Sequence, residues 1–174
     1  MSKPTLVSSP VQFKIAAADF LKISDGEISE LLEQVYVEGG FTTPGEAALL
    51  FEASAVRSRG DLICAREIGR SNLAGMVIVV PPGSPARRLA GSNEAELHLL
   101  GVKLEYRRHG LGRMLVEAAI ERANHLGYAK IILWTQPSMT AAQKLYESAG
   151  FRHTGNLERS GRDFRLYERL LTPT

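Results

Sequence analysis

The stretch Arg107-Arg108-His109-Gly110-Leu111-Gly112 decides how this sequence is interpreted, because it joins a strand-like apolar segment to an amphipathic helix. Its two glycines allow a tight turn and a close approach of the backbone to a ligand. The unpaired N–H groups of the first helical turn and the helix dipole favour an anion such as phosphate. A strand-to-helix turn also needs glycine for geometry alone, so the loop by itself leaves phosphate binding and a structural turn equally open.

The segments around this loop alternate between predicted strands and helices. Residues 94–104 form a strand that runs into the loop, and residues 111–126 form the helix that begins where a phosphate would lie. Residues 130–135 contain few polar side chains, which predicts a strand buried on both faces near the centre of a sheet.

The remaining segments complete a mixed α/β pattern without internal repeats or a dividing linker. Residues 81–93 are rich in Pro, Gly, Ser and Arg, which predicts a surface loop with Arg87 and Arg88 in solvent. The pattern predicts one domain over residues 1–174, with residues 1–10 flexible. The other predicted strands are 11–15, 61–68, 74–80, 151–157 and 163–171, and the other predicted helices are 19–37, 44–60 and 139–149.

Composition is that of an ordinary globular protein: 174 residues, 44% hydrophobic and 23% charged, enough to bury one core. The formal net charge of +2 gives no reason to expect a nucleic acid or a membrane as partner. The single cysteine, Cys64, lies in an apolar run, which predicts a buried thiol and neither an internal disulfide nor a cysteine-based metal site. Neither a signal peptide nor an apolar run long enough to span a membrane is visible, so we expect a cytoplasmic location.

Two stretches resemble motifs of the GNAT family of N-acetyltransferases. The first runs from the strand Leu97–Val102 to the loop Arg107–Gly112. The second is Ala142–Phe151, which is similar to the family motif A-x-x-L-Y-x-x-x-G-F. Two motifs in the right order are much more specific than either alone, and the resemblance extends from Val11 to Leu171.

The resemblance implies a single GNAT-like α/β domain, with a central, mixed but mostly antiparallel sheet of about seven strands and helices on both faces. It implies an acyltransferase that moves the acetyl group of acetyl-CoA to a primary amine by direct attack in a ternary complex, without a metal. A small molecule is the expected acceptor, and a protein N-terminus or lysine stays open. Pairing through the final strands is common in the family, so we expect a homodimer.

The family's cofactor-binding positions can be carried over to this chain. The resemblance implies that backbone groups of the strand hold the pantetheine arm and that an N–H at or near Val102 stabilises charge on the thioester oxygen. It also implies that loop N–H groups hold the pyrophosphate, while Arg107 and Arg108 attract the anionic cofactor. The implied cofactor-binding residues are Leu100, Gly101, Val102, Arg107, Arg108, His109, Gly110, Leu111 and Gly112.

The resemblance also implies the chemical roles of side chains. Tyr146 is expected to be the general acid that protonates the departing thiolate. Glu96 is the first candidate for the general base; Glu94 and His98 share its face of the strand by two-residue alternation, and a base acting through water stays open. Met139 stands seven residues before Tyr146, where relatives often have Asn, so acyl-CoA binding is better supported than turnover.

Two other functions compete with this interpretation. The main rival is a sensor or interaction module that binds acyl-CoA without transferring the acyl group. A nucleotide-phosphate-binding protein is disfavoured because the loop lacks the Gly-Lys-Ser/Thr ending of a P-loop. The identity of the amine is open; the acidic residues of the first helix either attract a cationic amine or form a solvated face. These residues are Glu27, Glu30, Glu33 and Glu38.

Overall fold

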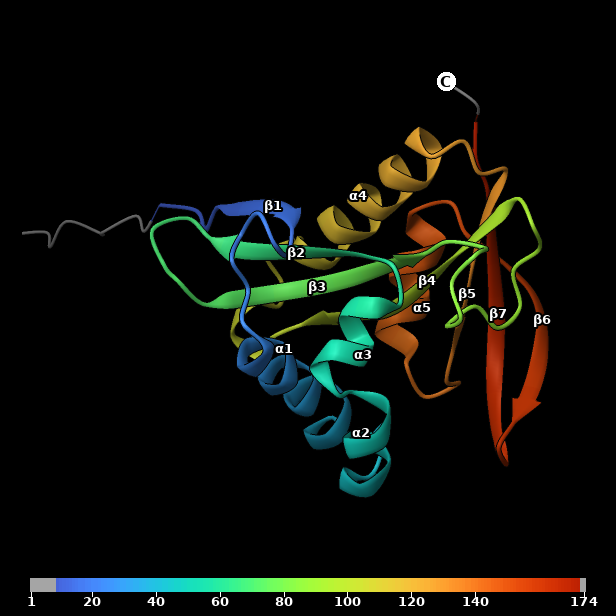
Figure 1. Ribbon diagram of the computed structural model, residues 1–174, viewed down its shortest axis with the longest axis horizontal. Helices are drawn as coiled ribbons and strands as arrows, with labels where there is room; N and C mark the ends of the chain where they lie inside the picture. Colours follow the sequence, from blue (N-terminus) through green and yellow to red (C-terminus); the bar gives the residue numbers. More distant parts are fainter. Residues whose placement is uncertain (1–8, 173–174) are drawn as a thin grey trace, which may run out of the picture.

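The computed structural model describes residues 9–172, which form a strongly twisted seven-stranded sheet with helices on both faces (Figure 1). The strand order is β1-β2-β3-β4-β5-β7-β6. Only β4 and β5 run parallel, and all other neighbours are antiparallel. The predicted mixed, mostly antiparallel architecture is confirmed. Residues 1–8, most of the segment expected to be flexible, lie outside the described residues.

The elements follow the predicted order closely. The strands are β1 (Phe13–Ala17), β2 (Asp61–Glu67), β3 (Leu73–Val80), β4 (Glu94–Val102), β5 (Lys130–Thr135), β6 (Arg152–Arg159) and β7 (Arg162–Leu170). The α-helices are α1 (Asp25–Leu32), α2 (Pro44–Leu50), α3 (Ala53–Ser58), α4 (Leu111–His125) and α5 (Thr140–Ser148). A π-helical segment, η1 (Glu33–Glu38), continues α1, and a 3₁₀ turn, η2 (Leu104–Tyr106), follows β4.

Local capping explains where the helices differ from their predicted ranges. The helix predicted to begin at residue 19 begins at Asp25, because Ser24 and Glu27 form a reciprocal capping box. The helix predicted for residues 44–60 is two helices, because the Glu52 carboxylate accepts the first N–H groups of α3 and starts a new helix there. None of the helices within residues 9–172 is long and apolar enough to cross a membrane.

Each face of the sheet has its own core. Figure 1 shows α4 on one side of β1, β2 and β3, and α1, α2 and α3 on the other. All eight residues of β3 are buried: Val77 and Val79 face the core shared with α4 and α5, whereas Met76 and Ile78 face the core shared with α1 and α3. Cys64 lies in the second core, and burial raises the pKa of its thiol to about 12. The prediction of a buried thiol is confirmed.

The two parallel strands separate soon after they begin. Only the first three residues of β4 and β5 pair, and the last pair is Glu96 with Ile132. Further along, β4 carries one residue more than β3 between two of their pairs, and Leu99 in this bulge has a φ of 50°. The bulge and the separation leave the second half of β4 without β5 as a backbone partner.

A buried carboxylate fastens the 81–93 loop to β4. The Glu96 side chain is fully buried, and its Oε1 accepts the backbone N–H groups of Arg88, Leu89 and Ala90 at 2.8, 2.5 and 2.8 Å. Its Oε2 lies 2.7 Å from Nε2 of His98. Burial alone raises the pKa of Glu96, but the bonds from His98 and the three N–H groups outweigh it and hold the pKa at about 2.

We expect Glu96→Gln to remove a pH-dependent part of the stability. A carboxyl group whose pKa is lower in the folded state stabilises the fold above its unfolded pKa of 4.5 and loses this contribution as the pH falls toward the folded pKa. Between about pH 6 and pH 2.5, the wild-type free energy of unfolding, measured with urea, should fall by about 2–3 kcal/mol more than that of Glu96→Gln. The matched control is Glu38→Gln at an exposed position, which should keep the wild-type pH dependence. An unchanged pH dependence in Glu96→Gln would contradict this assignment.

Candidate active site

The loop before α4 presents a row of free backbone N–H groups. Arg108 and Gly110 have φ values of 64° and 74°, in the left-handed region that turns the chain sharply. No described residue accepts a hydrogen bond from the backbone N–H groups of residues 108–113, and Gly110, the N-cap of α4, has no side chain to cap the helix. A Cβ at Gly110 would point into open space. The loop therefore fits a phosphate on geometry as well as on charge.

The second glycine of the loop has a different role. A Cβ at Gly112 would lie 3.1 Å from Cδ2 of Leu145 on α5, so glycine allows α4 and α5 to approach closely. The neighbouring Leu111 is 1% exposed, and its side chain belongs to the core. Of the predicted loop residues, Arg107, Arg108 and His109 have exposed side chains.

Unpaired polar groups also lie where β4 and β5 separate. The N–H of Lys103 donates to the carbonyl of Ala74 in β3, at 2.9 Å. Successive N–H groups of a strand point to opposite edges, so the N–H of Val102 points toward the side that β5 has left. Near the end of β5, the Oγ1 of Thr135 is buried without a hydrogen-bond partner among residues 9–172. Such groups fit the amides of a pantetheine arm, because buried polar atoms need partners.

Tyr146 combines a packed ring with a free hydroxyl. The side chain is 6% exposed, and its ring packs against Phe151 and Tyr167, with centroids 5.8 and 6.3 Å away. No described residue hydrogen-bonds to the hydroxyl. Burial raises the pKa of Tyr146, and the nearby Tyr36 phenol adds to the effect. The hydroxyl therefore stays protonated at neutral pH and is free to donate to a ligand.

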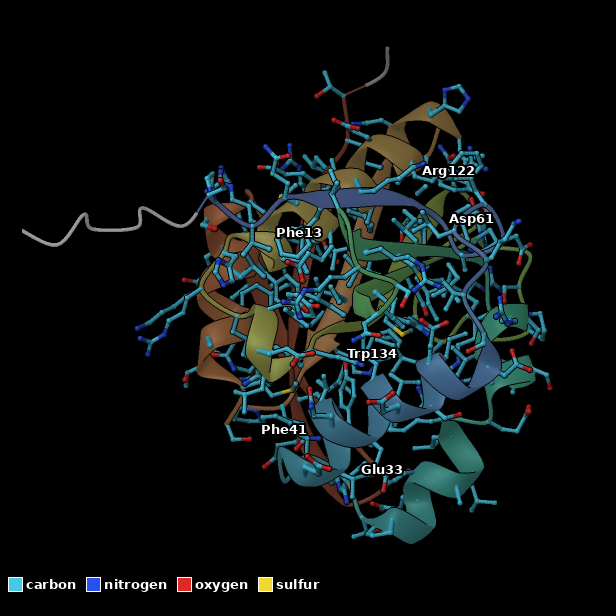
Figure 2. The ribbon with its side chains drawn as sticks, turned by 90° about the vertical axis from the view of Figure 1, so that its left-hand side faces the viewer. Phe13, Glu33, Phe41, Asp61, Arg122 and Trp134 are labelled. Carbon is cyan, nitrogen blue, oxygen red and sulfur yellow. The ribbon has the colours of Figure 1, made fainter. Side chains whose placement is uncertain are left out.

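His98 and Glu96 form an oriented pair beside the point of separation. Because Glu96 is ionised and only accepts hydrogen bonds, Nε2 of His98 carries a hydrogen and Nδ1 keeps its lone pair. Burial lowers the pKa of His98, and the raising effect of Glu96 does not overcome it, so the ring is neutral near pH 7. The ring packs edge-on against Trp134, 5.1 Å between centroids; Figure 2 shows Trp134 in the middle of the molecule.

This geometry distinguishes the three candidate bases. Both carboxylate oxygens of Glu96 are occupied inside the protein, which favours a role in orienting His98. Glu94 accepts the N–H of Gly91 and pairs with Lys130 at 3.1 Å, at the opposite end of β4 from Val102. His98 alone keeps an unoccupied basic atom.

Sequence reasoning missed Tyr36, which lies on η1. Its hydroxyl donates to the carbonyl of Leu100 in the β4 bulge at 3.0 Å, and its ring packs against Phe51. Tyr36 thus contacts the bulge of β4 from η1, although no motif marks it in the sequence. A π-helical turn often accompanies a functional site, but such a turn is not readable from side-chain periodicity.

The acidic residues of α1 and η1 are partly engaged in structure. Glu27 caps α1 and pairs with Arg66 at 2.8 Å, and Glu30 pairs with Lys103 at 3.3 Å. Two of the four carboxylates that could attract a cationic amine are therefore already paired with basic side chains. Figure 2 shows Glu33 and Phe41 in the lower part of the view and the ion pair of Asp61 and Arg122 at the upper right.

Comparison with known proteins gives sequence and structural matches. The model of the acetyltransferase (GNAT) family matches residues 27–151. N-acetyltransferase family 8 member 3 of Rattus norvegicus is 36% identical over 86 residues, which cover 49% of this chain and 36% of that relative. The similarity thus spans about a third of the relative's length.

Solved structures share the fold at low sequence identity. A GNAT acetyltransferase from Staphylococcus aureus Mu50 has a TM-score of 0.68 at 18% identity, covering 92% of this chain and 100% of its own. A Bacillus subtilis acetyltransferase in complex with CoA has a TM-score of 0.62 at 20% identity, covering 93% and 99%. The family match extends from α1 to the end of the second motif, and the sheet and the free N–H loop agree with it. This chain belongs to the acetyltransferase (GNAT) family.

Proposed function

We propose that this protein is an N-acetyltransferase that transfers the acetyl group of acetyl-CoA to a primary amine of a small molecule by direct attack in a ternary complex. The proposal rests above all on the free N–H groups of residues 108–113, which adjoin a half-strand of β4 that β5 has left. Together they provide partners for a pyrophosphate and for an extended arm bearing amides. Family membership supports the same assignment.

In this proposal, backbone and arginine side-chain groups of the chain bind acetyl-CoA. The N–H groups from Arg108 to Gly112 bind the pyrophosphate at the N-terminus of α4. The exposed guanidinium groups of Arg107 and Arg108 increase the rate of encounter with the anionic molecule. Backbone groups of Leu100, Gly101 and Val102 receive the pantetheine arm.

Acetyl-CoA supplies, when bound, an acetyl thioester that an amine nitrogen can attack. Nδ1 of His98 takes a proton from the amine as the N–C bond forms and the C–S bond breaks. The N–H of Val102 donates to the thioester oxygen and stabilises the negative charge that develops there. Glu96 holds His98 in the tautomer with its hydrogen on Nε2, and it stabilises the ring when Nδ1 is also protonated.

Tyr146 completes the proton balance. Its hydroxyl donates a proton to the sulfur as the C–S bond breaks, so CoA leaves as the thiol. Burial raises the pKa of Tyr146, but a thiolate in the same buried place is also poorly solvated, so the transfer exchanges one buried anion for another. Solvent then returns a proton to Tyr146 and removes the one held by His98.

We expect acetyl-CoA to bind with a Kd below about 1 mM in calorimetry and free thiol to appear when primary amines are added. The only cysteine is buried, so a thiol reagent reports CoA with little background from the protein. The amine panel includes small amines and peptides with a free N-terminus or lysine, which test the two acceptor classes. Absence of acetyl-CoA binding would overturn the proposal, and binding without thiol release from any amine would favour a sensor.

Replacing Tyr146 by Phe should lower kcat by about 100-fold and change the Kd of acetyl-CoA by less than about threefold. The ring stays in the core, so only the proton donor is lost. Tyr128→Phe, at another partly buried tyrosine, is the matched control and should leave both constants unchanged. An equal loss of binding and turnover in Tyr146→Phe would indicate a packing role.

Replacing His98 by Gln should lower kcat/KM by about 100-fold or more, because the general base is lost. In the wild type, kcat/KM should fall as the pH drops through the pKa of His98, which lies below its usual 6.5. The variant should lack this acidic limb, as measured in pH profiles of thiol release. His125→Gln, at an exposed position of α4, should keep the wild-type profile. Protonation of the amine lowers kcat/KM at acidic pH in the wild type and in His98→Gln, so the informative feature is the further fall at the pKa of His98. If this further fall persists in His98→Gln, His98 is not the base.

A further inference from the structure

Two arginines without carboxylate partners lie near His98. Arg59 stands on the turn between α3 and β2, and Arg88 stands in the 81–93 loop. The Nη2 of Arg59 donates to the carbonyl of Leu50 at 2.7 Å, and the Nη1 of Arg88 donates to carbonyls of its own loop. Within residues 9–172, neither guanidinium forms a salt bridge.

Hydrogen bonds hold the segments that carry these arginines against the site. The Ser84 hydroxyl donates to the carbonyl of Arg59 at 2.7 Å, which joins the loop to the α3–β2 turn. The backbone N–H of Arg88 donates to Glu96, which joins the same loop to β4 next to His98. The two guanidinium groups and the candidate base therefore share one region of the molecule.

The mutual electrostatic effects agree with this placement. Burial is the main cause of the lowered pKa of His98, and the charges of Arg59 and Arg88 lower it further. Burial also lowers the pKa of Arg59, with an additional contribution from Arg88, and the charge of Arg59 reaches the phenol of Tyr36.

The carboxylates near this region are already engaged. Glu52 accepts the N–H groups at the start of α3, and Glu46 pairs with Arg162 at 2.8 Å. Glu96 is bonded through both oxygens. A partly buried guanidinium beside a second positive charge is unfavourable unless an anion joins it, and the described residues leave no carboxylate for Arg59.

We propose that Arg59 binds a carboxylate of the acceptor, with Arg88 adding charge, so that the substrate is an amine that carries a carboxylate, as an amino acid does. The inference rests on the proposed acetyltransferase function and names the class of its acceptor. A guanidinium binds a carboxylate through paired N–H donors. In an amino acid a single carbon separates the amine from the carboxylate, which suits an anion site close to the base. The rings of Tyr36 and Phe51, 5.3 Å apart, offer an apolar wall for the side chain.

The test compares amino acids with their own carboxamides as acceptors. We expect kcat/KM for the free acids to exceed that for the amides by about 10-fold or more. The amino group of an amide is less basic and more often uncharged at neutral pH, so a preference for the acid runs against amine reactivity. The decarboxylated amines, which lack the group altogether, should be as poor as the amides.

Substitutions of the arginines test whether they cause the preference for free acids over amides. Arg59→Gln keeps an N–H donor for the carbonyl of Leu50. It should lower kcat/KM for the acids by about 10- to 100-fold and change kcat/KM for the amides by less than about twofold. Arg59→Lys should retain part of the preference, and Arg88→Gln should reduce it less than Arg59→Gln. Arg87→Gln, at the neighbouring position in the same loop, which is exposed as Arg88 is, is the control and should behave as wild type.

The outcomes separate this inference from the function on which it rests. If amides and decarboxylated amines are acetylated as well as the acids, or if Arg59→Gln lowers both classes equally, the carboxylate site is wrong and the acetyltransferase function stands. If no amine of any class releases thiol, the proposed function fails and the acceptor class fails with it. Thermal unfolding of each variant shows whether a uniform loss comes from unfolding.

Discussion

The hydrogen-bonded carboxylate of Glu96 is the interaction on which the site depends most. Glu96 occupies the last position at which β4 still pairs with β5. One of its oxygens accepts hydrogen bonds from three consecutive N–H groups of the 81–93 loop, and the other orients His98. A buried charge is tolerated only when it is fully bonded, so the loop, the tautomer of His98 and the position of Arg88 are fixed together.

The remainder of the site follows from backbone groups that lose their partners. Beyond Glu96 the two strands diverge, and the bulge at Leu99 turns the backbone of β4 further from regular pairing. The loop before α4 leaves its N–H groups free, and Gly112 lets α5 bring Tyr146 close to them. Backbone polar groups without partners are costly inside a protein, and in the function proposed here bound acetyl-CoA supplies those partners.

Charged residues are distributed unevenly around the point where β4 and β5 separate. Acidic residues of α1 and of the α2–α3 region serve mainly as helix caps and ion-pair partners, as Glu27, Glu46 and Glu52 do. Arg59 and Arg88 have no such partners among the described residues. A net charge of +2 hides this contrast, because the formal sum counts paired and unpaired groups alike. The positive charge proposed to bind the acceptor is local.

Much of the fold and half of the candidate site are encoded in local patterns. Alternation, glycines and the two motifs predicted the seven strands, α4, and the positions of the glycine loop and of Tyr146 as candidates, because each depends on residues close in sequence. Tertiary structure decided the separation of β4 from β5, the contact of Tyr36 with Leu100, and which of His98 and Glu96 keeps an unoccupied basic atom. Each depends on burial or on bonds between segments distant in the chain, such as those of Arg88 with Glu96, and burial determines which ionisable groups are left free to act.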